Sequence, residues 1–193
     1  CEVARTSGGN QIHTHSTIVD ESIGTDIEKD GDQIIRETID NERFYLVYQP
    51  IVSLKGDKSE QYEVLLRITD ADGHVILPGQ FLAIAARSGH SAEIDRWVIS
   101  KTFTTYAEHG EDHDSTFFIK VTSATLADPE FPDWVGEKLL EYDLDFKNIV
   151  FEISERSVIS NINQAAAFVE TMHSMNCRVA LEHFGASDQA TQI

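Results

Sequence analysis

Short apolar segments that alternate with amphipathic helical patterns constrain the fold of this chain more than any other feature. Strands are expected at 44–52, 61–68, 116–121, 148–153 and 178–184. Helices are expected at 78–86, 92–109, 132–142 and 163–175. This alternation predicts an α/β fold in which a parallel sheet is covered by crossover helices.

Three of the expected strands carry a glutamate near the carboxyl end, namely Glu63, Glu152 and Glu182. Because the carboxyl ends of the strands meet at one mouth of a parallel barrel, we expect these three side chains to converge. Carboxylate oxygens are ligands that Mg²⁺ and Mn²⁺ prefer, and metal-dependent phosphodiester hydrolysis uses two such ions about 3.5–4 Å apart. Each glutamate taken alone is better explained as a solvated strand end.

The amino-acid composition limits the kinds of ligand this chain can bind and indicates the cellular compartment in which it folds. The formal net charge of −18 argues against a nucleic-acid polymer or an anionic membrane surface, since both require basic patches. A small anionic ligand needs only one or two well-placed cations. There is no apolar run of transmembrane length, and Cys1 and Cys177 do not form a disulfide pattern. A reducing, cytoplasmic location is the expectation.

The sequence motifs around the glutamates resemble those of a known family. The segments that carry the resemblance are Tyr48–Ile51, Glu63–Arg67, Phe151–Glu155 and Ala180–Gly185. They resemble the EAL-domain family, which comprises cyclic di-GMP phosphodiesterases and their inactive relatives. The resemblance implies a TIM-like (β/α) barrel and cyclic di-GMP as the ligand.

Some metal positions of the family are retained, and others have changed. Glu63 and Glu152 match metal-binding glutamates, and Glu155 matches an acid that supports a loop over the site. Lys120 stands in place of the metal-binding asparagine, and Glu182-His183 replaces an Asp-Asp pair. A charged lysine cannot ligate a metal and repels a cation placed beside it. The predicted site has therefore lost its metal and its hydrolytic activity. Mg²⁺ or Mn²⁺ is expected only if a weak phosphodiesterase remains.

Ligand binding is a separate expectation, assigned to Gln49, Glu63, Leu65, Arg67 and Asp95. Arg67 lies on the same strand face as Glu63 and Leu65 by alternation, and its guanidinium suits a phosphate. Gln49 can donate a hydrogen bond to a base or a phosphate. Asp95 matches a family aspartate near the nucleotide, and a surface acid paired with a nearby base is the alternative.

Lys120 itself has two readings. Its ammonium can neutralise Glu63 or Glu152, or it can contact a phosphate of the ligand. In both cases the site does not need a metal.

Three regions are expected along the chain. Residues 1–17 resemble the last turn and strand of a GGDEF domain, although an ordinary helix–turn–strand fits equally well. Residues 18–40 read as a linker and a helix, and residues 41–193 as the N-terminal two-thirds of an EAL-like domain. A full barrel takes about 250 residues, so we expect the barrel to be incomplete at the C-terminus.

The leading prediction is a catalytically inactive domain that binds cyclic di-GMP as a signalling receptor. Further segments resemble family members that act in type IV pilus regulation, which implies control of pili or surface motility through a protein partner. A weak metal-dependent phosphodiesterase and a scaffold that binds no nucleotide are the alternatives. The oligomeric state, with a homodimer among the options, stays open.

Overall fold

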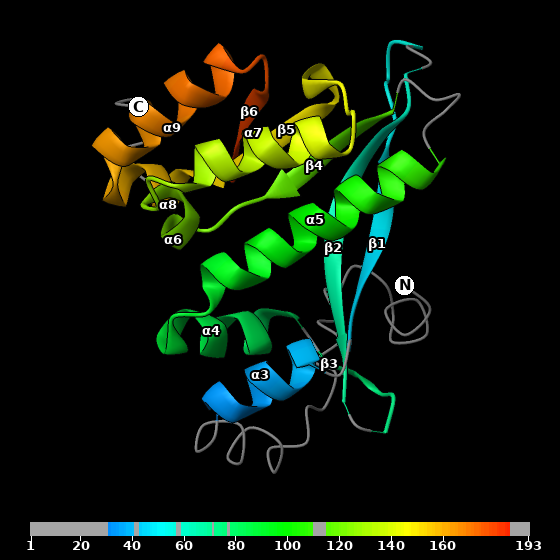
Figure 1. The fold of residues 1–193 in the computed structure, drawn as a ribbon, viewed down its shortest axis with the longest axis vertical. Helices are drawn as coiled ribbons and strands as arrows, with labels where there is room; N and C mark the ends of the chain where they lie inside the picture. The colour runs from blue at the N-terminus through cyan, green and yellow to red at the C-terminus, as the bar shows by residue number, and fades with distance from the viewer. Residues whose placement is uncertain are drawn as a thin grey trace, which may run out of the picture.

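The computed structural model describes residues 31–40, 43–56, 59–70, 72–76, 78–109 and 115–185. These residues form one sheet in the order β1-β2-β4-β5-β6, with helices packed along it (Figure 1). The strands are β1 (Phe44–Ile51), β2 (Gln61–Thr69), β4 (Thr116–Lys120), β5 (Ile149–Ser154) and β6 (Arg178–Glu182). A two-residue strand that the sequence did not reveal, β3 (Val75–Ile76), pairs with β2 beside this path.

The sheet is parallel from β2 to β6, as predicted, but β1 is antiparallel to β2. The sheet is therefore mixed, with one antiparallel strand at this edge. The physical reason is the length of the connection between the two strands. A parallel crossover needs a dozen or more residues, whereas the polar segment 52–60 allows only a hairpin return.

Helices connect the parallel strands. Between β2 and β4 lie α4 (Pro78–Ser88) and α5 (Ser91–His109), and between β4 and β5 lie α6 (Ser123–Leu126), α7 (Phe131–Glu141) and the 3₁₀ turn η1 (Phe146–Asn148). The last crossover holds α8 (Glu155–Ser160) and α9 (Ile162–Ser174). The long helices agree with the sequence pattern. The short helices α6 and α8 were not expected, because four to six residues are too few to show a 3.6-residue period.

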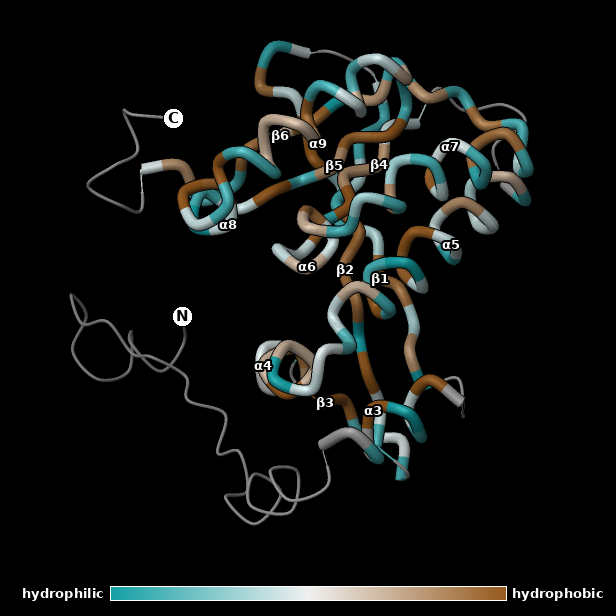
Figure 2. The backbone as a smooth tube through the Cα atoms, turned by 60° about the vertical axis from the view of Figure 1, so that its left-hand side comes forward, coloured by the Kyte–Doolittle hydropathy of each residue, from teal (hydrophilic) through white to brown (hydrophobic). Residues whose placement is uncertain are grey.

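The core lies between the helices and one face of the sheet. Phe131 of α7 is fully buried, and its ring centroid lies 5.9 Å from those of both Phe151 of β5 and Phe168 of α9. Figure 2 shows the hydrophobic stretches running along β4 and β5 at the centre of the sheet. These two central strands consequently carry their polar residues, Lys120 and Glu152, toward one rim of a well-packed sheet.

The N-terminal helix α3 (Gly31–Asp40) belongs to the same core. Ile35 is fully buried and Thr38 is 2% exposed. The carbonyl of Thr38 accepts a hydrogen bond of 3.1 Å from the backbone N–H of Arg43. The predicted GGDEF-like segment at 1–17 and the linker up to residue 30 lie outside the described residues.

The predicted fold class is confirmed: the structure is α/β, with a parallel sheet and crossover helices. Among the described residues the sheet is open, with β1 and β6 as its edges. No helix in the described part of the chain has both the length and the apolar character needed to cross a bilayer.

Candidate ligand-binding site and carboxylate cluster

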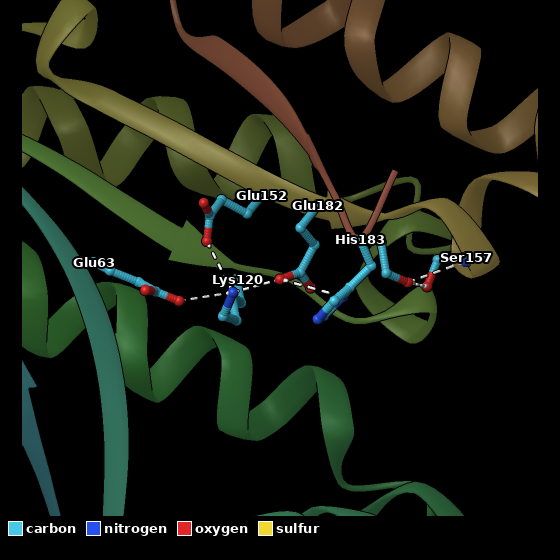
Figure 3. Close-up of polar contacts among 7 residues, drawn as sticks. Glu63, Lys120, Glu152, Ser157, Glu182 and His183 are labelled. Carbon is cyan, nitrogen blue, oxygen red and sulfur yellow. Dashed lines mark hydrogen bonds and ion pairs between the residues drawn. The ribbon is translucent and has the colours of Figure 1, made fainter. Parts of the chain in front are cut away.

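Lys120 is the centre of the predicted site. Its Nζ lies 2.9 Å from Oε1 of Glu63 and 3.1 Å from Oε2 of Glu152. It also forms a hydrogen-bonded ion pair with Oε2 of Glu182 (Figure 3). The structure thus brings together all three glutamates that the sequence placed on separate strands, around one ammonium group.

Strand register explains how the cluster forms. Lys120, the last residue of β4, is paired directly with Glu152 of β5. Glu182, the last residue of β6, is paired with Ser154, two residues further along β5. Residues that are paired or two apart on adjacent strands share a face of the sheet, so their side chains point toward one another.

Glu63 reaches the cluster from a different position than predicted. It is not near the carboxyl end of its strand but early in the nine residues of β2, opposite Phe118. β2 continues past the end of β4 because its remaining residues pair with β1 and β3. The side chain of Glu63 thus reaches Lys120 at the carboxyl end of β4 although β2 itself runs on to Thr69.

The cluster is partly shielded from solvent. The exposed fraction is 41% for the side chain of Lys120, 26% for Glu63, 15% for Glu152 and 18% for Glu182. Partial burial acts to lower the pKa of Lys120, but its contacts with the carboxylates of Glu182, Glu63 and Glu152 outweigh it and raise that pKa. Lys120 is therefore a permanent cation at physiological pH.

His183 and Glu155 lie beside the cluster. The side chain of His183 is 73% exposed, with Nδ1 3.7 Å from Oε2 of Glu182. Its backbone is in the left-handed region at φ 56°, which is uncommon for a residue other than glycine. The carboxylate of Glu155, 1% exposed at the start of α8, accepts a hydrogen bond of 2.5 Å from the backbone N–H of Gly185. Glu155 thereby fixes the turn that carries His183.

Asp95 is buried in α5 and holds the segment that follows Lys120. Its Oδ2 accepts hydrogen bonds from the backbone N–H and the hydroxyl of Thr122, both at 2.7 Å. The hydroxyl of Thr125 donates a third at 2.5 Å. Burial raises the pKa of Asp95, although these hydrogen bonds oppose the shift. The alternative of a surface acid paired with a base is therefore wrong for Asp95.

The next residue of α5 holds the same segment at its other end. Nη2 of Arg96 lies 2.7 Å from Oδ2 of Asp128, and its guanidinium lies 4.7 Å from the centre of the Trp134 ring. Adjacent residues of one helix thus secure both ends of 122–128. No sequence pattern indicated this arrangement.

A cavity of about 510 Å³ opens next to the cluster. Of the predicted residues, Leu65, Arg67, Asp95, Lys120 and Glu182 line it. The hydroxyl residues Ser91, Thr122, Ser123, Ser154 and Ser157 also line it and were not predicted. Thr122 and Ser154 follow or end a central strand, which is the one signal that could have indicated them.

Arg67 supplies a cation to this cavity that is not committed to a carboxylate. Its Nη1 donates a hydrogen bond of 2.9 Å to the carbonyl of Leu66, and no acid of the described residues lies within ion-pair distance. Gln49, by contrast, is exposed on β1 opposite Glu63 and does not line the cavity.

The cluster does not suit a pair of divalent ions. An ion bound between the glutamates would have to displace the ammonium of Lys120 or lie against it, and like charges at that distance repel strongly. Lys120 also offers no lone pair to a metal while it is charged. Elsewhere in the described residues, Asp70, Asp72 and His74 bring ligand atoms within 4.8 Å of one another at the exposed turn after β2.

Comparison with known proteins identifies the class. Residues 32–192 match the EAL domain family, so the chain belongs to that family. The cyclic di-GMP phosphodiesterase PdeF of Escherichia coli (strain K12) is 28% identical over 152 residues, covering 78% of this chain and 20% of PdeF. The cyclic di-GMP phosphodiesterase PdeB of Shewanella oneidensis is 27% identical over 191 residues, covering 96% of this chain and 22% of PdeB. The chain therefore spans less than a third of these curated relatives.

Solved structures of EAL domains resemble this one over most of its length. The FimX EAL domain from Pseudomonas aeruginosa bound to c-di-GMP matches with a TM-score of 0.79 and 34% identity, over 84% of this chain and 66% of that one. The Xanthomonas citri FimX EAL domain in complex with c-di-GMP matches with a TM-score of 0.76 and 27% identity, over 90% of this chain and 67% of that one. The predicted EAL resemblance is thus confirmed at the level of the family.

Proposed function

We propose that this chain is a catalytically inactive EAL domain that binds cyclic di-GMP and acts as a signalling receptor. The observation that carries the proposal is the position of Lys120, whose ammonium contacts Glu63, Glu152 and Glu182 at once. A cation fixed on the chain occupies the space where two metal ions would have to act. The carboxylates are thereby neutralised in part rather than recruited for hydrolysis.

The neighbouring cavity supports ligand binding. Arg67 presents an uncommitted guanidinium there, and such a group forms two parallel hydrogen bonds with a phosphate. Apolar side chains, including Leu65, make up most of the remaining wall and suit the flat faces of bases. The FimX EAL domains that resemble this chain were solved with c-di-GMP, which makes the same ligand the first candidate.

The other predicted ligand-binding residues take supporting roles. Asp95 keeps one carboxylate oxygen on the segment 122–125 and lines the cavity, so it orders the wall on which the ligand lies. Glu155 holds the turn after β6 through Gly185. Gln49 and Glu63 lie opposite each other on β1 and β2, outside the lining of the cavity, so any contact they make would be with a part of the ligand that extends beyond it.

A titration followed by calorimetry tests the binding. In EDTA, cyclic di-GMP is expected to bind the unmodified chain, and Arg67→Ala is expected to weaken binding roughly 10- to 150-fold, the loss of one charge-assisted hydrogen-bond pair of about 1.5–3 kcal/mol. Lys101→Ala is the matched control, because it removes one positive charge from an exposed position of α5 outside the cavity. Equal binding by Arg67→Ala and Lys101→Ala would refute the assignment of Arg67. No binding by the unmodified chain would favour a nucleotide-free scaffold.

A second experiment tests the loss of hydrolysis. The chain is incubated with excess cyclic di-GMP and Mn²⁺, and the products are separated by chromatography. We expect the cyclic dinucleotide to be recovered intact. Accumulation of the linear dinucleotide at a rate that depends on enzyme concentration would show that a phosphodiesterase remains.

The proposal also includes a cellular role. Segments of this chain resemble the FimX receptors, which favours regulation of type IV pili or surface motility through a protein partner in the cytoplasm. A pull-down with and without cyclic di-GMP tests this role. Retention of the same partner under both conditions would contradict a ligand-dependent receptor.

A further inference from the structure

The Lys120 cluster has a geometric property that goes beyond the absence of hydrolysis. A lysine ammonium has three N–H donors, and three carboxylates from three different strands surround it: Glu152 and Glu182 accept hydrogen bonds from Nζ, and Oε1 of Glu63 is ion-paired with it at 2.9 Å. The charge of Nζ is therefore already surrounded by carboxylates of the protein. A ligand phosphate could gain a hydrogen bond from Lys120 only if one of the glutamates lost its own.

We infer that Lys120 is an internal structural cation, which ties together the strands β2, β4, β5 and β6 in the way a bound divalent ion would. Two consequences follow. The unmodified chain gains nothing from a divalent ion at this place, and removal of the ammonium turns the same three carboxylates into a site that binds one. The inference rests on the premise of the proposed function that Lys120 excludes metal, but it does not require that the chain bind a nucleotide.

Charge balance is the reason for the second consequence. Glu63, Glu152 and Glu182 bring up to three negative charges to within hydrogen-bonding distance of a single point. Their side chains are only 15–26% exposed, so water screens them incompletely. Without Lys120 the three charges repel one another across the rim of the sheet. A divalent ion relieves this repulsion, and carboxylate oxygens are ligands that Mn²⁺ and Mg²⁺ accept.

The distances also suit the replacement of the Lys120 ammonium by a divalent ion. The Nζ–O separations of 2.9 and 3.1 Å are about 1 Å longer than metal–oxygen bonds of this class. Small rotations of flexible glutamate side chains close that gap. Lys120→Ala leaves room for the ion with its remaining water ligands, whereas Lys120→Asn adds one amide oxygen to the three carboxylates.

The test measures thermal unfolding of the full chain in EDTA and in millimolar MnCl₂, without nucleotide, and counts bound Mn²⁺ by electron paramagnetic resonance. All proteins carry His74→Ala, because the Asp70, Asp72 and His74 group is a second place where Mn²⁺ could bind. The chain with Lys120 intact is expected to show the same melting temperature in both conditions and no tightly bound ion.

Lys120→Ala is expected to melt roughly 5 °C or more below this reference in EDTA, to recover in MnCl₂ and to bind one Mn²⁺. The matched control is Lys120→Ala/Glu152→Gln, which removes one ligand and is expected to lose the recovery. Lys120→Asn is the second variant and is expected to bind Mn²⁺ at least as tightly as Lys120→Ala.

The outcomes are decisive in either direction. Stabilisation of the Lys120-containing chain by Mn²⁺ overturns the inference. It is also overturned if Lys120→Ala stays unfolded or unstable in both EDTA and MnCl₂ and Lys120→Asn also fails to bind Mn²⁺. Recovery that persists in the Glu152→Gln double variant places the ion elsewhere and also overturns it. Because no nucleotide is present, failure of cyclic di-GMP binding leaves these results unaffected, and the two proposals are tested separately.

Discussion

Asp95 offers a direct test of how the wall of the cavity is held. Asp95→Ala removes three hydrogen bonds at once, two to Thr122 and one to Thr125. Hydrogen bonds to a charged acceptor contribute about 1.5–3 kcal/mol each, but Asp95 is 6% exposed and the cost of burying its charge offsets part of that gain. The backbone N–H of Thr122 also loses its partner, at about 1–3 kcal/mol. We expect a net loss of about 2–4 kcal/mol in the free energy of unfolding.

Urea unfolding followed by circular dichroism measures this loss, and the matched control is Thr125→Val. That variant removes one of the three hydrogen bonds and leaves Asp95 and Thr122 in place, so it is expected to cost about 1 kcal/mol. The two effects should not add in a double variant, because both act on the same carboxylate. An Asp95→Ala protein within about 0.5 kcal/mol of the unmodified chain would refute the role assigned to Asp95.

The pH dependence of the free energy of unfolding provides a second test of the role assigned to Asp95. Burial raises the folded-state pKa of this carboxyl above its ordinary value of 3.8. A group with a raised folded pKa contributes its full stability below the unfolded pKa, and that contribution is lost as pH rises through the folded pKa. Asp95→Asn does not titrate, so the stability of this variant relative to the unmodified chain should improve as the pH rises above about 4. A difference that stays constant over this range would contradict the raised pKa.

Three further outcomes are expected from the fold. Ile35→Ala should lower the free energy of unfolding by about 2–5 kcal/mol in urea titration, because α3 is part of the core; a change below about 0.5 kcal/mol would mean that α3 acts as a linker. Phe131→Ala should cost about 3–5 kcal/mol through loss of its packing on Phe151 and Phe168, and full retention of stability would contradict that packing. In a Cys1→Ser background, Cys177 should not react with a thiol reagent near pH 8 until urea unfolds the chain, since burial raises its pKa to about 12; rapid labelling of the folded protein would be inconsistent with this.

Much of the fold could be predicted from local pattern. The order of the strands and long helices follows from apolar periodicity, and the predicted bounds differ from the observed ones by one or two residues at most ends. The direction of β1 could also have been inferred, because the segment 52–60 is too short for a crossover. The helices α6 and α8 were missed because they are shorter than two turns of helix.

The site was only partly predictable. The types of the residues show which chemical groups are available, but they do not show which side chains come into contact in the folded chain. The sequence identified Glu63, Glu152 and Glu182 as acids on separate strands and Lys120 as a cation among them. It left open whether Lys120 meets one acid, two, or a ligand. The hydrogen bonds of Asp95 to a segment 27–30 residues away were equally invisible.

By itself, the sequence determined the class of this protein. The alternation of strands and helices, the EAL-type motifs and the lysine at a position where a metal ligand is expected can all be recognised without a structure. Only the tertiary structure decided that Lys120 satisfies three carboxylates at once and that Arg67 is left to face the cavity. The physical reason is that strand and helix type depend on residues a few positions apart. The meeting of side chains depends instead on which strands pair and in what register, and lateral hydrogen bonding between distant segments sets both.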